Sequence, residues 1–417
     1  MGGSVINVLY PMVTGLDRSR FMPIVLFYWP HPYQEKLERA GVQTLVFDKP
    51  RRVNHPTLIT NLQNQQEARV QALRHERSWR RDLYHTVGSY LRLSYLAPQI
   101  LRLAQIIREC DVDLVHLNRD AGVEGREVVL AAKLAGRPVL CYAQNFSKFY
   151  PVDRQIGGLV DLYIGCSTAV GQHCIAHGGA RLARNLTIYP GVADPEKWAQ
   201  KHDIARTRQS FNWTPNDFVV GCIGRLVAWK GQDVFLKALA EVKREIPDIK
   251  GLIVGGGIAK RDTDTSQPSF QEELLALAQA LGLAQNVHFT GFRDDIPALM
   301  GTVDILVHSS IEPEPFATTV IEGMMAGRPV IATNAGGMPE MINHGVTGLL
   351  VPPQDSQAMA QAILDYSHDR ERMHRLALAG QQVAHTRLTA QRHIAEFEAV
   401  YARLLRIPCG ALAETVH

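Results

Sequence analysis

Two glutamates, Glu314 and Glu322, are separated by seven residues in the second half of the chain. The apolar run at residues 305–307 predicts a buried strand, and residues 318–326 predict a helix. A strand, a short loop and a helix in this order direct the free N–H groups of the helix at a ligand above the sheet. Such glutamate pairs are also common on exposed helices, so their context decides. We interpret the pair as a donor site for a nucleotide sugar, one carboxylate suiting sugar hydroxyls and the other a ribose diol.

Two cations form a second candidate group upstream. A short apolar strand at residues 219–223 is followed by Gly224, Arg225 and Lys230. Gly224 would let the backbone approach a ligand closely. Open α/β sheets bind ligands at the carboxyl ends of their strands, where both cations would stand. Arginine as a fork and lysine as a compact charge suit a diphosphate leaving group, although alone they also fit a surface turn.

Further segments in which a strand meets a turn, or a loop enters a helix, follow in order. They are residues 252–257, 286–293, 295–300, 327–333, 336–340 and 345–352. With the carboxylates and cations, they make the second half resemble glycosyltransferase family 4, the retaining GT-B enzymes also called glycosyl transferases group 1. The resemblance covers nearly the whole second half, with at least five motifs in family order.

The resemblance implies roles for individual residues. Arg225 and Lys230 would bind the donor diphosphate, with Lys230 facing solvent. Glu314 and the amides after it would hold the transferred sugar, and Glu322 the ribose. Arg225, Lys230 and Glu314 are the expected catalytic residues. The other expected donor-binding residues are Gly224, Phe292 and Arg293 near the base, and Pro315, Phe316, Ala317 and Thr318, of which Ala317 stands where the family usually has Gly.

The first half alternates strands and helices as well, which predicts a second doubly wound parallel sheet. Strands are expected at residues 24–28, 43–47, 114–117, 139–143 and 162–167, and helices at 127–135 and 168–177. The expected fold class is α/β, a GT-B fold of two Rossmann-like domains facing across a cleft. By resemblance, residues 1–192 form the acceptor domain, completed by a C-terminal helix within 391–417, and residues 193–390 form the donor domain.

The start of the chain departs from the family pattern. Family members begin with an apolar strand that runs into a Gly-Gly loop, whereas this chain opens on Gly2 and Gly3 with a helix-like segment at residues 5–13. The first strand of a doubly wound sheet is central, so its loss would leave unpaired backbone groups on both neighbours. We therefore expect the natural product to begin roughly 8–15 residues upstream, with about 5–6 of them in the strand.

The acceptor side offers fewer signals. Gly2 and Gly3 would form a turn that faces the acceptor or a phosphate. His116 ends a predicted strand and Asn118 lies just beyond it, although His116 also fits a structural role. Gln144 and Asn145 stand where many family members have a histidine, and they complete the expected acceptor set.

Composition limits the class of protein. A length of 417 residues allows two or three domains with sizeable cores, and a net charge of +3 is too small to indicate nucleic-acid binding. The six cysteines have no paired spacing, which indicates free thiols in a reducing compartment. No stretch of 18 apolar residues is present. We expect a cytoplasmic protein without a membrane-spanning segment.

Residues 51–108 are rich in arginine, with aromatic and aliphatic residues interleaved. Two interpretations stay open. The segment is an ordinary basic helical face, or it is a peripheral patch that docks on anionic lipid headgroups while the enzyme reaches a lipid-linked or polymeric acceptor. No nucleic-acid motif accompanies the charge, so we expect no nucleic-acid partner.

The expected activity is that of a hexosyltransferase-type glycosyltransferase in polysaccharide or glycolipid biosynthesis. It would move a sugar, with retention, from a nucleoside diphosphate sugar to a hydroxyl of a glycan, a lipid-linked molecule or a small molecule. Arg225 and Lys230 would stabilise the leaving diphosphate. No cofactor or metal is expected. The alternatives are a nucleotide-sugar 2-epimerase, whose catalytic acids we do not find, and a non-catalytic sugar-nucleotide-binding protein, against which the intact donor motifs argue.

Overall fold

The computed structural model describes residues 4–47, 79–123, 125–192, 198, 203–256 and 269–407. The chain divides into two compact units. The C-terminal unit consists of Ile188–Ala395 with Cys166–Val170 and Met1–Val8. The N-terminal unit consists of Leu9–Gly165, Gly171–Thr187 and Glu396–His417. Helices α1 (Ser4–Gly15), α7 (Thr168–His177) and α17 (Ala390–Leu405) contribute residues to both units.

The C-terminal unit is built on a six-stranded parallel sheet with the order β12-β11-β10-β7-β8-β9. Strands covered on both faces form continuous apolar runs, which is why this half of the sequence shows short stretches of Val, Ile and Leu. The strands are β7 (Val219–Ile223), β8 (Lys250–Val254), β9 (Val287–Phe289), β10 (Ile305–His308), β11 (Val330–Thr333) and β12 (Leu349–Val351).

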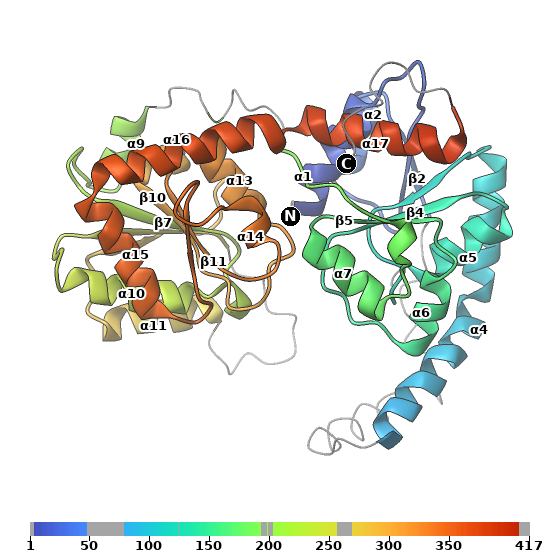
Figure 1. The fold of residues 1–417 in the computed structure, drawn as a ribbon, viewed down its shortest axis with the longest axis horizontal. Coiled ribbons are helices and arrows are strands. Elements are labelled where there is room, and N and C mark those ends of the chain that lie inside the picture. The colour runs from blue at the N-terminus through green and yellow to red at the C-terminus, as the bar shows by residue number, and fades with distance from the viewer. Residues whose placement is uncertain are drawn as a thin grey trace. The chain divides into compact units, whose positions relative to one another are not determined.

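Helices cover both faces of this sheet (Figure 1). Side-chain caps mark where several of them begin: Ser269 caps α11, Asp355 caps α15 and Asp369 caps α16. The helices are α9 (Ile204–Ser210), α10 (Gln232–Lys243), α11 (Phe270–Ala280), α12 (Ile296–Thr302), α13 (Thr318–Met325), α14 (Met338–Met341), α15 (Ser356–His368) and α16 (Arg370–Arg387). The buried core between sheet and helices includes Phe235, Ile253, Val307, Ile331 and Met359.

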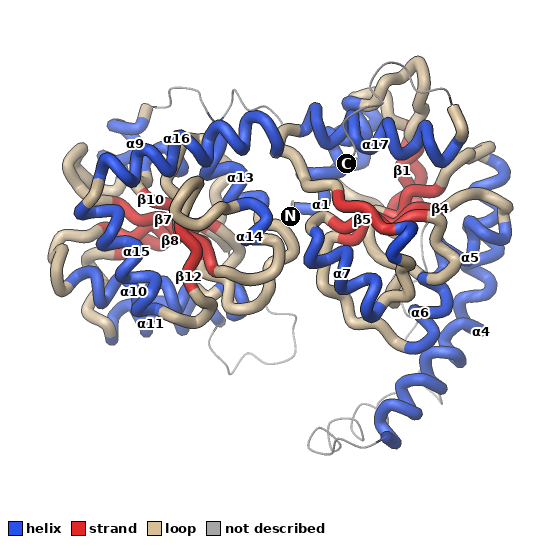
Figure 2. Tube along the Cα trace, in the orientation of Figure 1, coloured by secondary structure: helices blue, strands red, loops and turns tan. Residues whose placement is uncertain are grey.

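The N-terminal unit contains a four-stranded parallel sheet, order β3-β4-β5-β6, and a two-stranded parallel sheet of β1 and β2 (Figure 2). The strands are β1 (Ile24–Phe27), β2 (Gln43–Val46), β3 (Val115–Leu117), β4 (Val139–Ala143), β5 (Leu162–Gly165) and β6 (Asn185–Thr187). Within the described ranges, β1 pairs only with β2, and β3 only with β4. The expectation of a further strand upstream of Met1 stays a prediction.

The remaining helices of this unit are α2 (Tyr33–Arg39), α4 (Trp79–Glu109), α5 (Arg126–Leu134) and α6 (Pro151–Gly157). Helix α4 is 31 residues long and packs its C-terminal part on α5. Elements expected from the sequence are found with bounds that differ by one or two residues. The expected strand at 305–307 continues through His308, because this side chain is buried with the rest of β10. His308, this fourth residue of β10, contacts Glu314 in the candidate site described below.

A buried histidine anchors the segment that enters the C-terminal unit. His393 on α17 is 1% exposed, and its Nδ1–H donates to the Tyr189 carbonyl at 2.9 Å. Burial disfavours the charged ring and lowers the pKa of His393 to about 4, although the bond to Tyr189 acts in the opposite direction. An unfolded histidine has a pKa of about 6.5, so the unfolded state takes up the proton first as pH falls.

Stability should therefore fall as pH decreases from about 6.5 to about 4, and not above this window. In His393→Gln, the free energy of unfolding should fall by about 1–3 kcal/mol less across this pH range, because the substituted side chain does not titrate. Unfolding in urea at pH 7.5 and pH 5 measures the difference. His374→Gln is the matched control, since His374 is exposed on α16. Equal pH sensitivity in the wild type and both variants would contradict the assignment.

Candidate active site

The two candidate motifs lie side by side because their strands are neighbours. β10 pairs with β7 in parallel, so the loops that leave both strands meet at one edge of the sheet. Two hydrogen bonds join the loops. The Ser309 hydroxyl donates to the Lys230 carbonyl at 2.9 Å, and the Ile311 N–H donates to the Trp229 carbonyl at 2.9 Å. The loop after β7, which carries Arg225 and Lys230, is here called the cation loop, and the loop after β10, which carries Glu314, the carboxylate loop. The main chain thus holds these two loops together.

Two glycines make this approach possible. Gly231 has a φ of 67°, and a Cβ there would lie 2.1 Å from the Ser309 carbonyl oxygen. Gly336 has a φ of 63°, and a Cβ there would lie 2.1 Å from the Glu314 carbonyl oxygen. Only glycine combines this backbone conformation with such close contacts at little cost. The Gly337 N–H also donates to the Glu314 carbonyl at 2.8 Å, so the Glu314 main chain is held by the next loop.

Lys230 and Glu314 form an ion pair at the centre of the site. Lys230 Nζ lies 2.5 Å from Glu314 Oε2, and the two side chains are 17% and 11% exposed. Lys230 Nζ also lies 4.4 Å from the centre of the Trp229 ring. The expectation that Lys230 faces solvent is wrong, because its ammonium is largely enclosed by its partner carboxylate and the indole.

Two further groups meet the same carboxylate oxygen. The Ser310 hydroxyl donates to Glu314 Oε2 at 3.1 Å, and His308 Nε2 lies 3.4 Å from it. Burial acts to raise the pKa of Glu314, but the hydrogen bond and charge of His308 and the Lys230 ammonium outweigh it and lower this pKa to about 2. Glu314 is therefore ionised at neutral pH.

The second cation is open to a ligand. Arg225 is exposed, while its carbonyl accepts a hydrogen bond of 2.8 Å from Gln232 Nε2 on α10. In the part of the chain that the structure describes, its guanidinium has no recorded ion pair. Gly224, the residue before it, donates from its N–H to the Val254 carbonyl at 2.8 Å, which fixes the turn. Arg225 and Lys230 thus stand on one loop, with Lys230 in an ion pair and Arg225 exposed.

The carboxylate loop enters α13 as the sequence predicts. Ala317 is the residue before the helix, with φ −87° and ψ 107°. This is an ordinary extended conformation, so the alanine, at a position where the resemblance suggested glycine, fits without backbone strain. Thr318 begins the helix, and the Val320 N–H in its first turn donates to the Ala317 carbonyl at 3.1 Å. The N–H groups of Thr318 and Thr319 come before the first intrahelical bond. Glu322 lies one turn further along α13 and is partly buried.

The other expected donor-binding residues differ in exposure and in their contacts. Phe316 is 7% exposed and stacks on Tyr189, with ring centres 5.2 Å apart. Pro315 precedes it and is partly buried. Phe292 is 75% exposed after β9, so its ring has a free face. Arg293 beside it forms two hydrogen bonds to Asp295, at 2.7 and 2.5 Å, and this pairing raises the pKa of Arg293.

The expected acceptor residues are only partly brought together. Asn118 and Gln144 follow the adjacent strands β3 and β4, and Gln144 Nε2 donates to Asn118 Oδ1 at 2.6 Å. Asn145 is exposed next to them. His116 instead contacts α17: its Nδ1 lies 2.6 Å from the Tyr401 hydroxyl. Gly2 and Gly3 lie outside the described residues.

Sequence reasoning missed two groups of the carboxylate cluster, His308 and Ser310. His308 is the last residue of β10 and Ser310 lies in the loop that follows, and both side chains are buried. The available signal was a histidine at the end of an apolar run, a position that a core strand normally fills with an apolar residue. Glu314 was identified from its spacing to Glu322, but spacing carries no information on what holds the carboxylate.

The basic segment lies mostly beyond the described residues. This holds for residues 51–78 and for most side chains in the first half of α4. Two of its arginines are described: Arg102 lies over the Phe47 ring, and Arg108 donates to the Leu134 carbonyl. No helix in the described ranges is both long and apolar enough to cross a membrane.

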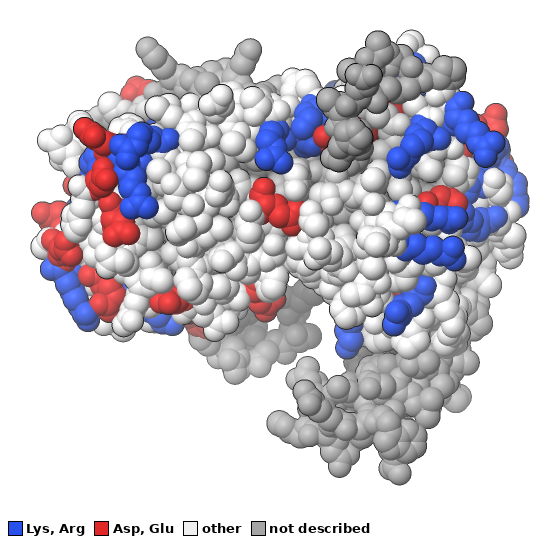
Figure 3. Space-filling view, in the orientation of Figure 1, with Lys and Arg blue, Asp and Glu red and all other residues white. Residues whose placement is uncertain are grey.

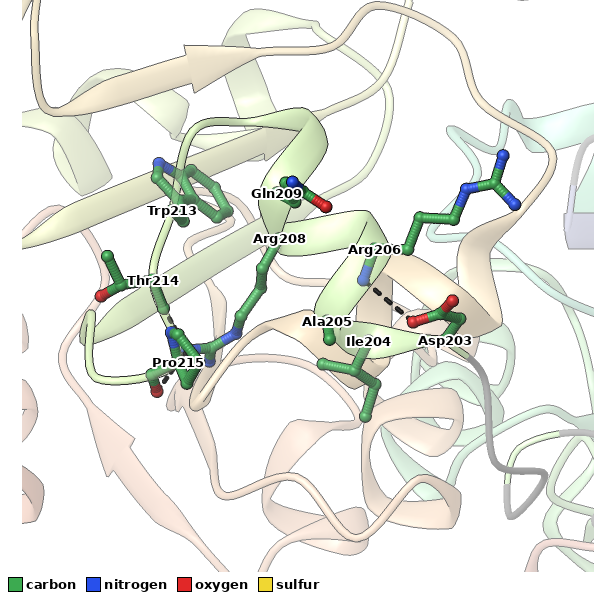
Figure 4. Close-up of a pocket in the computed structure, with 9 residues that line it drawn as sticks. All are labelled: Asp203, Ile204, Ala205, Arg206, Arg208, Gln209, Trp213, Thr214 and Pro215. Carbon is green, nitrogen blue, oxygen red and sulfur yellow. Dashed lines mark hydrogen bonds between the residues drawn. The ribbon is translucent and has the colours of Figure 1, made fainter.

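A separate depression of about 1020 Å³ runs along α9 (Figure 4). Arg208 is the main cation there, and its guanidinium already donates to the carbonyls of Thr302, Thr214, Pro215 and Asp217 and to the Asp304 carboxylate. These bonds join α9 to the segments at residues 214–217 and 302–304. Arg206 also lines the depression and is exposed, and its main-chain N–H donates to Asp203 Oδ1 at 2.9 Å. Among the described residues, no carboxylate of this lining is paired with a lysine as Glu314 is, so we assign the depression no ligand.

Known proteins resemble this chain in the sequence of the C-terminal unit and in the fold. Residues 203–383 match the family model for glycosyl transferases group 1. A putative glycosyltransferase, EpsD of Bacillus subtilis, is 28% identical over 331 residues, which span 75% of this chain and 83% of EpsD. A GDP-mannose-dependent phosphatidylinositol monomannoside mannosyltransferase of Mycolicibacterium smegmatis is 32% identical over 204 residues. That match spans 47% of this chain and 50% of the relative's length.

Among solved structures, HepE of Anabaena in complex with UDP is similar, with a TM-score of 0.74 and 26% identity. The match covers 96% of this chain and 96% of HepE. WaaG, a glycosyltransferase involved in lipopolysaccharide biosynthesis, has a TM-score of 0.62 at 14% identity, which shows the fold alone. The fold is α/β of the GT-B type, with two Rossmann-like domains, and the protein is an enzyme of the glycosyltransferase class.

Proposed function

We propose that the protein transfers a sugar from a nucleoside diphosphate sugar to a hydroxyl acceptor, with retention at the anomeric carbon. The observation that carries this proposal is the ion pair between Lys230 and Glu314 at the carboxyl edge of the sheet, with Arg225 exposed on the same loop as Lys230. Cations there suit a diphosphate, and an adjacent carboxylate suits the hydroxyls of the sugar attached to it. The complex of HepE with UDP supports a nucleotide ligand.

The proposed chemistry is mainly electrostatic. As the bond from the anomeric carbon to the β-phosphate oxygen breaks, the diphosphate gains charge, which Arg225, Lys230 and the N–H groups at the start of α13 stabilise. The same phosphate oxygen takes the proton of the attacking acceptor hydroxyl on the same face of the sugar. No protein base is then needed. The expectation that no metal takes part stays a prediction.

Each donor-binding residue would contact a different part of the donor. Glu322 is proposed to bind the ribose, and Phe292 offers an exposed ring near the base. Arg293 is held by Asp295, so we assign it to shaping this loop. Pro315, Phe316, Ala317 and Thr318 supply the backbone that surrounds the sugar.

The acceptor is proposed to be a glycan or a lipid-linked molecule. The similar mannosyltransferase of Mycolicibacterium smegmatis, named for phosphatidylinositol monomannoside, supports this class. Figure 3 shows more Lys and Arg than Asp and Glu on the visible face of the N-terminal unit, which supports an anionic partner such as a lipid headgroup. The cysteines in the described ranges are free thiols, which supports the cytoplasm as its compartment.

A panel of nucleoside diphosphate sugars tests the proposal. We expect one donor to release free nucleoside diphosphate, slowly with water and faster with an acceptor, in a coupled assay for the diphosphate. A donor recovered with an altered sugar would instead indicate a 2-epimerase. Donor binding by calorimetry without any turnover would indicate a non-catalytic binding protein. Both results contradict transfer.

The two glutamates should differ in kinetics. Glu322→Ala should mainly weaken nucleotide affinity, because a ribose contact is equally strong in the ground and transition states. Glu314→Ala should mainly lower kcat, by about 10²-fold, because Glu314 contacts the transferred sugar, whose conformation changes on the way to the transition state. Steady-state kinetics with the donor from the panel measure both effects. Glu312→Ala is the matched control, since Glu312 is exposed in the same loop. Equal losses of affinity alone in both variants would contradict these roles.

A further inference from the structure

The Glu314 carboxylate receives its three contacts on one oxygen. Lys230 Nζ, Ser310 Oγ and His308 Nε2 all approach Oε2, at 2.5, 3.1 and 3.4 Å. Within the described ranges, the other oxygen, Oε1, has no recorded partner. The side chain therefore has a held end and an open end. The open end is the one that can accept a hydrogen bond from a sugar hydroxyl.

A bound donor would affect Lys230 differently from His308 and Ser310. Lys230 comes from the cation loop, while His308 and Ser310 lie in the same short segment as Glu314. The main chains of the two loops are tied together by the bonds from Ser309 and Ile311. A bound donor can therefore draw away the Lys230 side chain, but it leaves His308 and Ser310 in place.

A diphosphate competes strongly for the ammonium. It carries more negative charge than one carboxylate, and a lysine serves phosphate as a flexible point charge. When Lys230 turns to the diphosphate, Glu314 loses a full positive charge while its side chain is only 11% exposed. A buried carboxylate without such a partner needs hydrogen bonds to stay ionised and in place.

We propose that His308 is a positioning residue of the donor site, which holds the Glu314 carboxylate for the sugar while the donor diphosphate occupies Lys230. This inference rests on the proposed function. His308 Nε2 lies 3.2 Å from Ser310 Oγ, so the hydroxyl can accept from the ring and donate to Glu314 Oε2. The ring thus supports the carboxylate directly and through the hydroxyl.

The environment of the imidazole supports a functional role. His308 is 7% exposed at the end of an otherwise apolar strand. Its Nδ1 is buried and has no hydrogen-bond partner among the described residues. Nε2 is the nitrogen that faces Ser310 and Glu314, so an N–H there can donate toward both. An unpaired buried nitrogen is unfavourable for stability, so a purely structural site would favour an apolar residue.

Three substitutions separate positioning from packing. His308→Leu keeps an apolar core but removes the donor, and His308→Gln can place an N–H near the position of Nε2. His308→Asn is equally polar but too short to reach it. We expect kcat with the donor from the panel to fall on the order of tenfold in the Leu and Asn variants, since a hydrogen bond to a charged group is lost. The Gln variant should recover most of this activity.

Affinity for the free nucleoside diphosphate, measured by calorimetry, should stay within about twofold of wild type in all three variants, because the diphosphate contacts Arg225 and Lys230. In a Glu314→Gln background, His308→Leu should add little further loss, since the carboxylate it supports is gone. Thermal unfolding identifies variants that do not fold, and the comparison of Gln with Asn then decides.

The outcomes distinguish this inference from the proposed function. If wild-type protein neither binds a nucleoside diphosphate nor consumes any donor of the panel, the proposed function fails. If wild type does both, and His308→Leu keeps full kcat, the positioning role is wrong. The role is also wrong if His308→Leu weakens diphosphate affinity as much as it lowers kcat, or if the Gln and Asn variants are equally impaired.

Discussion

The proposed donor site depends on one ion pair, between Lys230 and Glu314, at the edge where β7 and β10 lie side by side. Removing both charges from water is costly, and their attraction offsets the cost only with close geometry and further hydrogen bonds. The local structure supplies both. Gly231 and Gly336 allow the loops to approach, and His308 and Ser310 add contacts to the carboxylate. The surrounding sheet fixes the strands from which these loops leave.

This arrangement suits an enzyme that handles a charged leaving group. The cation that a diphosphate needs is already partly dehydrated and held in the site before the donor arrives, so only its side chain has to turn from Glu314 to the phosphate. Meanwhile the carboxylate that a sugar needs is kept ionised, with a pKa of about 2. A donor that carries both groups can separate the pair and replace each partner. Either ligand fragment alone would break the pair without replacing both contacts.

Much of the fold follows from local patterns in the sequence. Buried parallel strands such as β7 and β10 are continuous apolar runs, and the loops after them carry the charged residues, so both could be predicted. The contacts across the sheet could not. The pairing of Lys230 with Glu314 and the bond from His116 to Tyr401 join residues far apart in the chain, and both depend on tertiary structure. His308 lies close to Glu314 in the sequence, but its proposed supporting role depends on the conformation of the loop between them, which residue spacing does not give.

The most direct test is a crystal structure of the protein with the nucleoside diphosphate of its donor bound. The account predicts that Lys230 Nζ leaves Glu314 Oε2 and lies within hydrogen-bond distance of a phosphate oxygen, next to the Arg225 guanidinium. Glu314 should keep its contacts to His308 and Ser310. A bound diphosphate that leaves the Lys230–Glu314 ion pair intact and makes no contact with Lys230 would contradict the account.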